Sequence, residues 1–410
     1  MGFMTATPQP PASARDWLPL EVEQKLWIGD RLQQVFRQWG YQRVVTSTLE
    51  RLETLEAGGA IQPQTVIQVQ DISEGILGLR PELTASLARA CMARMANKSS
   101  PLRLYYASNV FRRSVSHHGR QVEFYQLGVE LLGAGSVLAD AEVLLLAIAC
   151  VQAVGLPNWQ IVLGEASLTR ALLQPFPEQL RSRVRYCLAH LDRVTLAQLP
   201  LDPSLLDRAL RLFDLRGRPA EVLQRVAGLE LDVEARAATE RLKSLIEILA
   251  QTTTEVTLLL DLSLVQTIDY YTGATFEVAV QTATGARVLG SGGRYDRLLE
   301  LYHPRGERRA GMGFAFGLEE LHAALLPTQQ LPQMAATSDW LVVPLESAAE
   351  VAAFKRARAL RQTTPTSKVE LELDASTQAE ARDRARICGI KNIVWVGADG
   401  SFETEAIAVQ

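Results

Sequence analysis

The sequence predicts an α+β fold: an antiparallel sheet flanked by helices, with a helical insertion and a small C-terminal α/β domain. Two β-rich stretches, 102–108 and 121–132, are joined by a polar loop, as neighbouring strands are. From 166 to 250 the chain is rich in Leu, Arg and Glu at helical spacing, which indicates inserted helices. In the last part of the chain, strand-like and helical stretches alternate, which is typical of an α/β domain.

The individual elements follow from hydrophobic spacing and from Pro and Gly at their ends. A first helix is predicted over 20–39, between Pro19 and Gly40. The other predicted helices span 82–97, 140–154 and 314–326, and the other strands span 44–48, 257–262 and 274–281. In the last part we expect strands at 341–345, 369–373 and 393–397, and helices at 348–362 and 376–388.

These patterns divide the chain into four parts. Residues 1–15 are rich in Pro and Ala and are predicted to be a flexible N-terminus. Residues 16–326 form the main domain, which contains the helical insertion at about 166–250. Residues 327–338 are polar and contain Pro327 and Pro332, which predicts a linker to a domain over 339–410.

Composition limits the classes of function. The 410 residues include 42 Lys and Arg against 46 Asp and Glu, a net charge of −4, so the chain has no overall basic charge for nucleic acid. Its cysteines are scattered without a CxxC pair, which predicts a cytoplasmic protein without a zinc site: Cys91, Cys150, Cys187 and Cys388. No apolar run approaches the roughly 20 residues that cross a bilayer, so we expect no membrane, and we expect no cofactor.

The stretch 123–132 predicts a strand with two different faces. With a period of two, Leu127, Val129 and Leu131 share an apolar face that must pack on a core. Gln126 and Glu130 share the other face, and Gly128 between them would leave room for a polar ligand. The alternative is an ordinary polar surface facing solvent.

The segment Phe111–Glu130, FRRSVSHHGRQVEFYQLGVE, aligns without gaps to the second motif of class II aminoacyl-tRNA synthetases and is the most specific match. Together with four further segments, it resembles histidyl-tRNA synthetases, which belong to that class. The others are DISEGILGLRPELT at 71–84, LVQTIDYYTGATFE at 264–277, LGSGGRYDRLL at 289–299 and GMGFAFGLEEL at 311–321. A weaker match to the dimer-forming first motif lies at 40–50, where Ser47 replaces the family's proline.

The resemblance implies a histidine-binding site. The positions that would hold the amino acid are Glu82, Thr84, Gln126, Glu130, Tyr270 and Tyr271. A carboxylate such as Glu82 suits the ligand's ammonium group, and tyrosines suit an imidazole. The alternatives are that Glu82 is only the acidic first turn of a helix and that the two tyrosines are core residues, but the rest of the pattern favours ligand binding. The adjacent histidines, 117 and 118, fit a solvated loop better than a metal site.

The ATP-binding part of the pattern is altered. Arg112 and Arg120 remain as possible residual anion contacts, but Ser114–Ser116 replace a Glu-Arg-Pro sequence of the family. Gln266 stands where the family has an arginine that promotes the reaction, and Glu320 stands where an arginine lies along the triphosphate. Preorganised positive charge is usually a large part of catalysis, so these changes predict that adenylation is lost and that no catalytic residue remains.

Retained histidine contacts with lost ATP contacts resemble the regulatory subunits of ATP phosphoribosyltransferase. That resemblance implies a non-catalytic subunit of histidine biosynthesis that activates a short catalytic phosphoribosyltransferase and confers feedback inhibition by L-histidine. It also implies a homodimer within a hetero-oligomer. Two alternatives remain, an active histidyl-tRNA synthetase and a tRNA-binding module; Gln266 and Glu320 argue against the first, and the acidic balance argues against tRNA.

Overall fold

The chain forms two compact units, which are described separately. One comprises Met1–Trp17 and Gln24–Leu331, and the other comprises Leu18–Glu23 and Pro332–Gln410. The computed structural model describes residues 10–11, 13–57, 61, 63–95, 98, 101–113, 121–253, 256–263, 271–282, 285–335, 337–363, 366–374 and 377–408.

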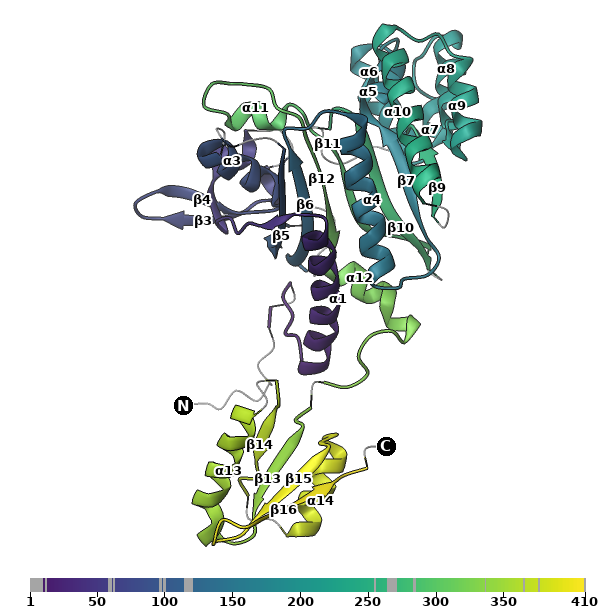
Figure 1. The fold of residues 1–410 in the computed structure, drawn as a ribbon. Helices are drawn as coiled ribbons and strands as arrows, with labels where there is room; N and C mark the ends of the chain where they lie inside the picture. Colours follow the sequence, from purple (N-terminus) through teal and green to yellow (C-terminus); the bar gives the residue numbers. More distant parts are fainter. Residues whose placement is uncertain are drawn as a thin grey trace, which may run out of the picture. The chain divides into compact units, whose positions relative to one another are not determined.

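A nine-stranded sheet, counted over the described residues, forms the centre of the larger unit (Figure 1). Its strands in spatial order are β1 (Gln42–Arg43), β5 (Leu102–Phe111), β6 (Glu123–Leu132), β12 (Gly311–Gly317), β11 (Gly285–Arg294), β10 (Ala274–Thr282), β7 (Trp159–Glu165), β9 (Thr257–Asp261) and β8 (Arg216–Gly217). Neighbours are antiparallel except for β1–β5 and β7–β9, which are parallel. The predicted α+β class is confirmed, with a sheet that is mixed at its two ends.

Helices cover both faces of this sheet. On one face lie α1 (Pro19–Gln38) and α4 (Val137–Ala153), as Figure 1 shows. Their apolar residues join the large core with Leu127, Val129 and Leu131 of β6, so the predicted apolar face of that strand is confirmed. On the other face, α3 (Thr84–Met95) and α11 (Leu298–Tyr302) enclose a second core that contains Tyr106, Tyr271 and Tyr295. The site lies against this second face.

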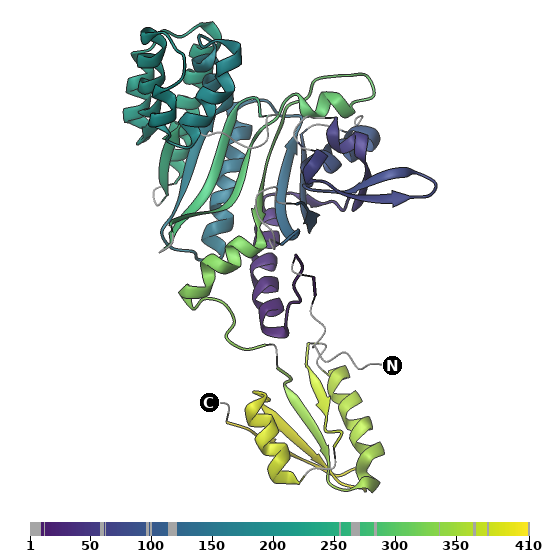
Figure 2. The same cartoon turned by 180° about the vertical axis from the view of Figure 1, so that it is seen from behind.

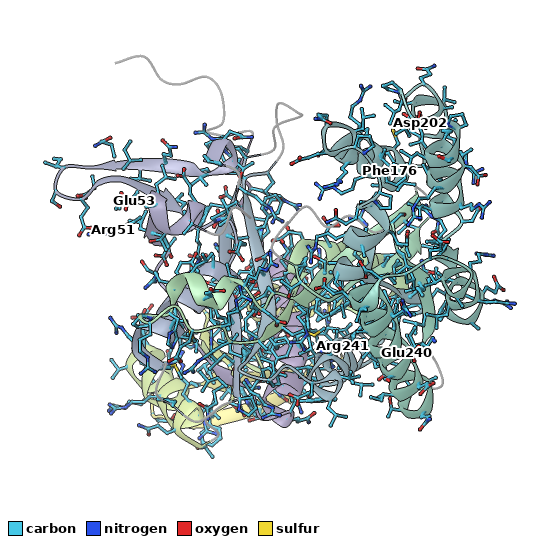
Figure 3. All side chains as sticks on the ribbon, turned by 90° about the horizontal axis from the view of Figure 1, so that it is seen from above. Arg51, Glu53, Phe176, Asp202, Glu240 and Arg241 are labelled. Atoms are coloured by element: carbon cyan, nitrogen blue, oxygen red, sulfur yellow. The ribbon has the colours of Figure 1, made fainter. Side chains whose placement is uncertain are left out.

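Two appendages extend from the larger unit on opposite sides of the main sheet (Figures 2 and 3). The first is a three-stranded sheet of β2 (Leu49–Arg51), β4 (Gly75–Leu79) and β3 (Ile67–Asp71), with α2 (Leu52–Glu56) and the 3-10 turn η1 (Pro63–Thr65). The second is the helical insertion: α5 (Ala166–Leu173), α6 (Glu178–Ala189), α7 (Arg193–Ala197), α8 (Pro203–Phe213), α9 (Pro219–Ala227) and α10 (Val233–Thr252).

The smaller unit is an α/β domain. Its sheet has the order β14 (Val369–Leu371), β13 (Trp340–Pro344), β15 (Asn392–Val396) and β16 (Phe402–Ala406). The helix α13 (Glu350–Thr363) contributes to one core cluster and α14 (Gln378–Ile387) to another, so the two helices cover opposite faces. This unit also contains the 3-10 turn η3 (Ser347–Ala349). In the larger unit, β12 is followed by the helix α12 (Leu318–Leu325) and the 3-10 turn η2 (Leu326–Thr328).

No helix among the described residues is long and apolar enough to span a bilayer.

Two predicted elements are wrong. Residues 44–48 are not a strand. The Val44 N–H donates a hydrogen bond to the Tyr105 carbonyl of β5 at 2.9 Å, but the carbonyl groups of Thr46 and Ser47 accept hydrogen bonds from the Arg80 guanidinium, at 2.9 and 3.2 Å. The helix expected over 314–326 starts only at Leu318, because residues 314–317 pair with β6 and β11 inside the sheet.

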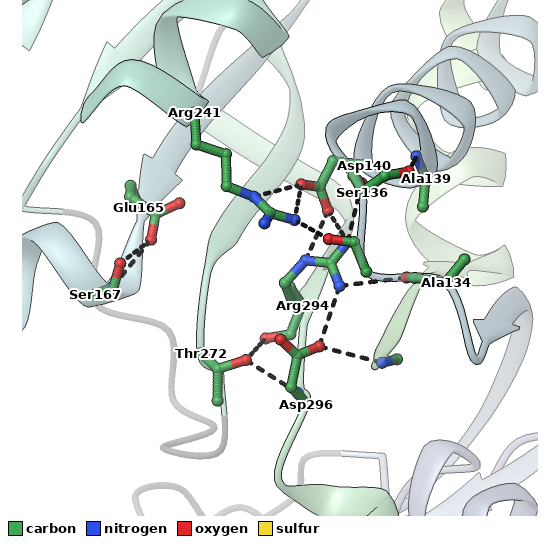
Figure 4. Close-up of polar contacts among 12 residues, drawn as sticks. Ala134, Ser136, Ala139, Asp140, Glu165, Ser167, Arg241, Thr272, Arg294 and Asp296 are labelled. Carbon is green, nitrogen blue, oxygen red and sulfur yellow. Dashed lines mark hydrogen bonds and ion pairs between the residues drawn. The ribbon is translucent and has the colours of Figure 1, made fainter. Parts of the chain in front are cut away.

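A buried ion-pair network joins the insertion to the sheet (Figure 4). The Arg294 side chain of β11 is 2% exposed, and its Nε donates to Oδ1 of Asp140 in α4 at 2.9 Å. The other oxygen of Asp140 accepts from Nη2 of Arg241 in α10 at 3.0 Å. A buried charge is tolerated only when it is paired and hydrogen-bonded, so this network fixes the relative positions of β11, α4 and α10.

Replacing Arg294 tests this conclusion. Arg294→Ala leaves the buried Asp140 carboxylate with Arg241 alone, so we expect the free energy of unfolding to fall by about 3–5 kcal/mol, measured by urea denaturation followed by circular dichroism. The matched control is Arg308→Ala, because Arg308 is 74% exposed and pairs with Glu300 at the surface at 2.9 Å. Such a pair contributes about 0–1 kcal/mol, and equal losses in both variants would contradict the assigned role.

Candidate functional site

A cavity of about 460 Å³ lies over the central strands β6, β11 and β12. Its lining includes Glu82, Thr84, Gln126 and Tyr271, which are four of the six positions predicted to contact histidine. Tyr270, another of the six, lies outside the described residues, as do Gln266 and the stretch 114–120, which includes Arg120. The sixth, Glu130, lies beneath the cavity and does not line it.

Glu82 has two roles in the local structure. Its two carboxylate oxygens accept hydrogen bonds from the backbone N–H groups of Thr84 and Ala85, at 2.7 and 2.8 Å, so it caps the start of α3. The same half-buried side chain lines the cavity. Burial raises the pKa of Glu82, while the helix N–H groups oppose that rise. The helix-start explanation is therefore correct, and it leaves the carboxylate facing the cavity.

Glu130 is a buried carboxyl held by hydroxyl groups. Its Oε1 accepts from the Thr84 hydroxyl at 2.7 Å, and its Oε2 accepts from the Tyr295 hydroxyl. There is room for it because Gly313 lies opposite on β12, where a Cβ would be 1.8 Å from Oε2. Burial raises the pKa of Glu130 from 4.5 to about 8, although the bonds from Tyr295 and Thr84 act in the other direction.

The open space that the sequence predicted above Gly128 is filled. Gly128 pairs with Tyr106 of β5, and a Cβ on Gly128 would be 2.5 Å from the Tyr106 hydroxyl. The Tyr106 ring therefore separates Gln126, which lines the cavity, from Glu130, which does not. Among the described residues, the Gln126 side-chain amide has no hydrogen-bond partner, so it is available to a ligand.

Aromatic side chains form the cavity walls. Tyr271 is 7% exposed, and its ring packs where a Cβ on Gly293 would be, at 2.8 Å. Phe124 also lines the cavity, and the Arg112 guanidinium lies 5.1 Å from its ring centre. Burial lowers the pKa of Arg112, and the nearby Glu82 raises it. A flat walled space beside carboxyl and amide groups suits a small polar molecule with an aromatic ring.

Two further carboxylates, Glu319 and Glu320, line the cavity beside Gln126, since Gly317 pairs with Gln126 and lies next to Glu320. Glu320 accepts a hydrogen bond from Nη1 of Arg287 on β11. Glu319 accepts from the backbone N–H of Tyr125 at 3.2 Å and lies 3.9 Å from the Lys25 ammonium, and burial raises its pKa. A polyanion such as a triphosphate would be repelled by these groups.

Several residues of the site were not foreseen: Tyr106, Arg287 and Glu319. The position of Tyr106 depends on the register of β5 against β6, which the sequence does not specify. Arg287 lies in a strand with few β-branched residues that was not predicted at all. Among the described residues, no three His, Cys, Asp or Glu side chains are grouped to hold a metal ion.

Comparison with known families supports this reading of the fold. The sequence profile described as histidyl-tRNA synthetase matches residues 13–321. The chain is 56% identical to a protein of Nostoc sp. named ATP phosphoribosyltransferase regulatory subunit, over 98% of this chain and 99% of that protein. A protein of the same name from Nostoc punctiforme is 54% identical over 97% and 99%.

Solved structures share the fold. A Bacillus halodurans protein described as ATP phosphoribosyltransferase regulatory subunit/histidyl-tRNA synthetase is 29% identical with a TM-score of 0.80, covering 97% of this chain and 99% of that one. A histidyl-tRNA synthetase of Nostoc sp. is 22% identical with a TM-score of 0.78, covering 98% and 97%.

The buried carboxyl of Glu130 predicts a pH dependence of stability. In the folded chain the Glu130 carboxyl keeps its proton up to about pH 8, whereas in the unfolded chain it loses that proton near pH 4.5. The free energy of unfolding should therefore fall as pH rises between these values. In Glu130→Gln no proton is lost, and the slope should be smaller. The slope is measured from the midpoints of urea denaturation between pH 5 and 8.5. Glu165, whose pKa is about 7, also titrates in this range and adds the same pH dependence to the wild type and the variant. Identical slopes would contradict the assignment.

Proposed function

Because the chain belongs to the family of ATP phosphoribosyltransferase regulatory subunits, we propose that it is a non-catalytic subunit that activates a short ATP phosphoribosyltransferase in the cytoplasm. We further propose that it binds free L-histidine and transmits feedback inhibition to that partner. In this assembly the chain is a homodimer within a hetero-oligomer. A ligand that favours one conformational state inhibits through a coupling free energy, typically about 1–3 kcal/mol.

The observation that carries the proposal is the set of groups that line the cavity. They include the Glu82 carboxylate, the Tyr271 ring and the Gln126 amide, which has no partner among the described residues, and these match an ammonium group and an imidazole. Glu320, in an ion pair with Arg287, lines the same cavity where the synthetase pattern has an arginine for the triphosphate. This arrangement favours a free amino acid over an amino acid with ATP.

Catalysis of adenylation is the main alternative, and the synthetase-like fold favours it. Against it stand Gln266 and Glu320, since both remove positive charge from a reaction that develops negative charge on phosphate. Relatives that are 56% and 54% identical to the chain carry the name of the regulatory subunit. Histidine-dependent exchange of pyrophosphate into ATP by the chain alone would favour the synthetase.

A tRNA-binding module is the third possibility. The α14 helix carries Arg382, Arg384 and Arg386, but acidic groups neutralise them. Arg384 pairs with Glu370 and Glu372 at 2.9 and 2.7 Å. Arg382 and Arg386 pair with Glu405 and Asp383, each at 2.8 Å. Because Arg382 and Arg384 are only 34% and 39% exposed, their pairs are screened less by solvent than fully exposed ones, and this helix offers less positive charge to an RNA backbone.

Histidine affinity is the first test. Glu82→Ala and Gln126→Ala each remove a polar partner of the proposed ligand, at about 1–3 kcal/mol per lost bond. Calorimetry should therefore show roughly 5- to 150-fold weaker histidine binding. Glu74→Ala, an exposed carboxylate of the β3–β4 turn, is the control and should bind normally. Because Glu82 also caps α3, circular dichroism must show that its variant is folded. Unchanged affinity in both cavity variants would place the histidine site elsewhere.

Association with a catalytic subunit is the second test. When the chain is co-expressed with a short ATP phosphoribosyltransferase, we expect one peak in size exclusion with light scattering and a higher catalytic rate than the partner has alone. Histidine should lower that rate in the wild-type complex and less so with Gln126→Ala. Two separate peaks with an unchanged rate on mixing would overturn the proposed partnership while leaving histidine binding open to its own measurement.

A further inference from the structure

A second cavity, of about 680 Å³, lies in the helical insertion and shares no lining residue with the first. Of the described residues that line it, four are arginines: Arg193, Arg211, Arg216 and Arg225. One lining residue, Asp214, is acidic. The other carboxylates that pair with these arginines, Asp207, Glu221 and Asp261, do not line the cavity.

The four arginines converge from separate elements. Arg193 is the first residue of α7, Arg211 lies in the last turn of α8, Arg216 lies in β8, and Arg225 lies in the last turn of α9. Arginines that follow an extended nucleic-acid backbone form a stripe along one surface. Side chains that meet around one hollow instead suit a compact ligand, and the volume lies in the range of small-molecule sites.

The acidic partners of the exposed arginines hold them weakly. Arg193 pairs with Asp214 at 3.1 Å and Arg211 with Asp207 at 2.8 Å, and these arginine side chains are 59% and 67% exposed. Arg225 and Glu221 are 3.8 Å apart. Exposed ion pairs contribute about 0–1 kcal/mol, so a ligand with several negative charges can compete for these guanidinium groups.

Arg216 is the most enclosed of the four. Its Nη2 donates to the Leu188 carbonyl at 3.2 Å and to the Ser263 hydroxyl, and its nearest carboxylate, Asp261, is 3.7 Å away. Its Nε is buried and donates to no described residue. Because this atom is buried, Arg216 contributes its positive charge to the cavity wall and not a hydrogen bond from Nε.

We propose that this cavity binds a small anion that carries two or more phosphate groups, such as a nucleoside diphosphate. Guanidinium groups form paired, charge-assisted hydrogen bonds with phosphate oxygens, which suits a ligand with adjacent phosphates. Leu191, which is 55% exposed, and Leu229 add apolar lining that a nucleoside can cover. The site is separate from the histidine cavity, so its existence does not depend on the function proposed above.

The test is calorimetry on the full chain at low salt with pyrophosphate and with ADP. The double variant Arg193→Gln/Arg211→Gln changes only exposed side chains, and it should bind both probes at least about tenfold more weakly. Arg216→Gln should show a similar loss, provided that circular dichroism shows it folded. The control is Arg183→Gln, an exposed arginine of α6 that does not line the cavity and should bind as the wild type does.

The outcomes separate the possible ligands. Tighter binding of ADP than of pyrophosphate identifies a nucleotide, and equal binding identifies the diphosphate group alone; both support the site. If neither probe binds, the proposed site is overturned. It is also overturned if Arg183→Gln loses as much affinity as the cavity variants, because binding would then depend on the overall surface charge and not on this cavity. Binding of a tRNA but of neither probe, with loss in the double variant, would assign the arginines to RNA and overturn the small-anion proposal.

Discussion

The buried pairing of Asp140 with Arg294 holds the geometry of the first cavity. Arg294 ends β11, and both of its chain neighbours are part of the cavity structure. Gly293 receives the ring of Tyr271, and the Tyr295 hydroxyl donates to Glu130. Because the guanidinium is fixed to α4 and, through Asp140, to α10, neither neighbour can shift without exposing a buried charge. The ion pair thus holds the groups that line or support the cavity in fixed positions relative to the core.

Within this frame, two carboxyl groups at the cavity are held by different kinds of hydrogen-bond donor. Glu130 accepts from the hydroxyl groups of Thr84 and Tyr295, and burial raises its pKa to about 8. Glu82 is held by the backbone N–H groups at the start of α3, which favour its charged form against the effect of burial. A cationic ligand group beside Glu82, which does line the cavity, would lower the pKa of that carboxyl, so binding and proton release would be coupled.

The sequence predicted those features that depend on local pattern. The period of two in β6 correctly predicted that Leu127, Val129 and Leu131 are buried. The sequence-based prediction was wrong where the structure depends on pairing between distant strands. Tyr106 fills the space above Gly128 only because of the β5–β6 register, and residues 314–317 are a strand because they lie between β6 and β11. Glycines that admit close backbone approach carry no hydrophobic signal of their own, so β11 and β12 were missed.

The altered charge at Glu320 shows how a fold can keep its stability when the binding groups of its cavity change. Glu320 reverses a charge relative to the synthetase pattern, yet it is 44% exposed and has a partner in Arg287. The substitution therefore costs little stability, since half-exposed pairs contribute little in either direction. Its effect on a bound triphosphate is larger, because the repulsion acts inside a cavity where solvent screens less. Binding chemistry can thus be changed at this position while the core, fixed by Arg294 and Asp140, stays as it is.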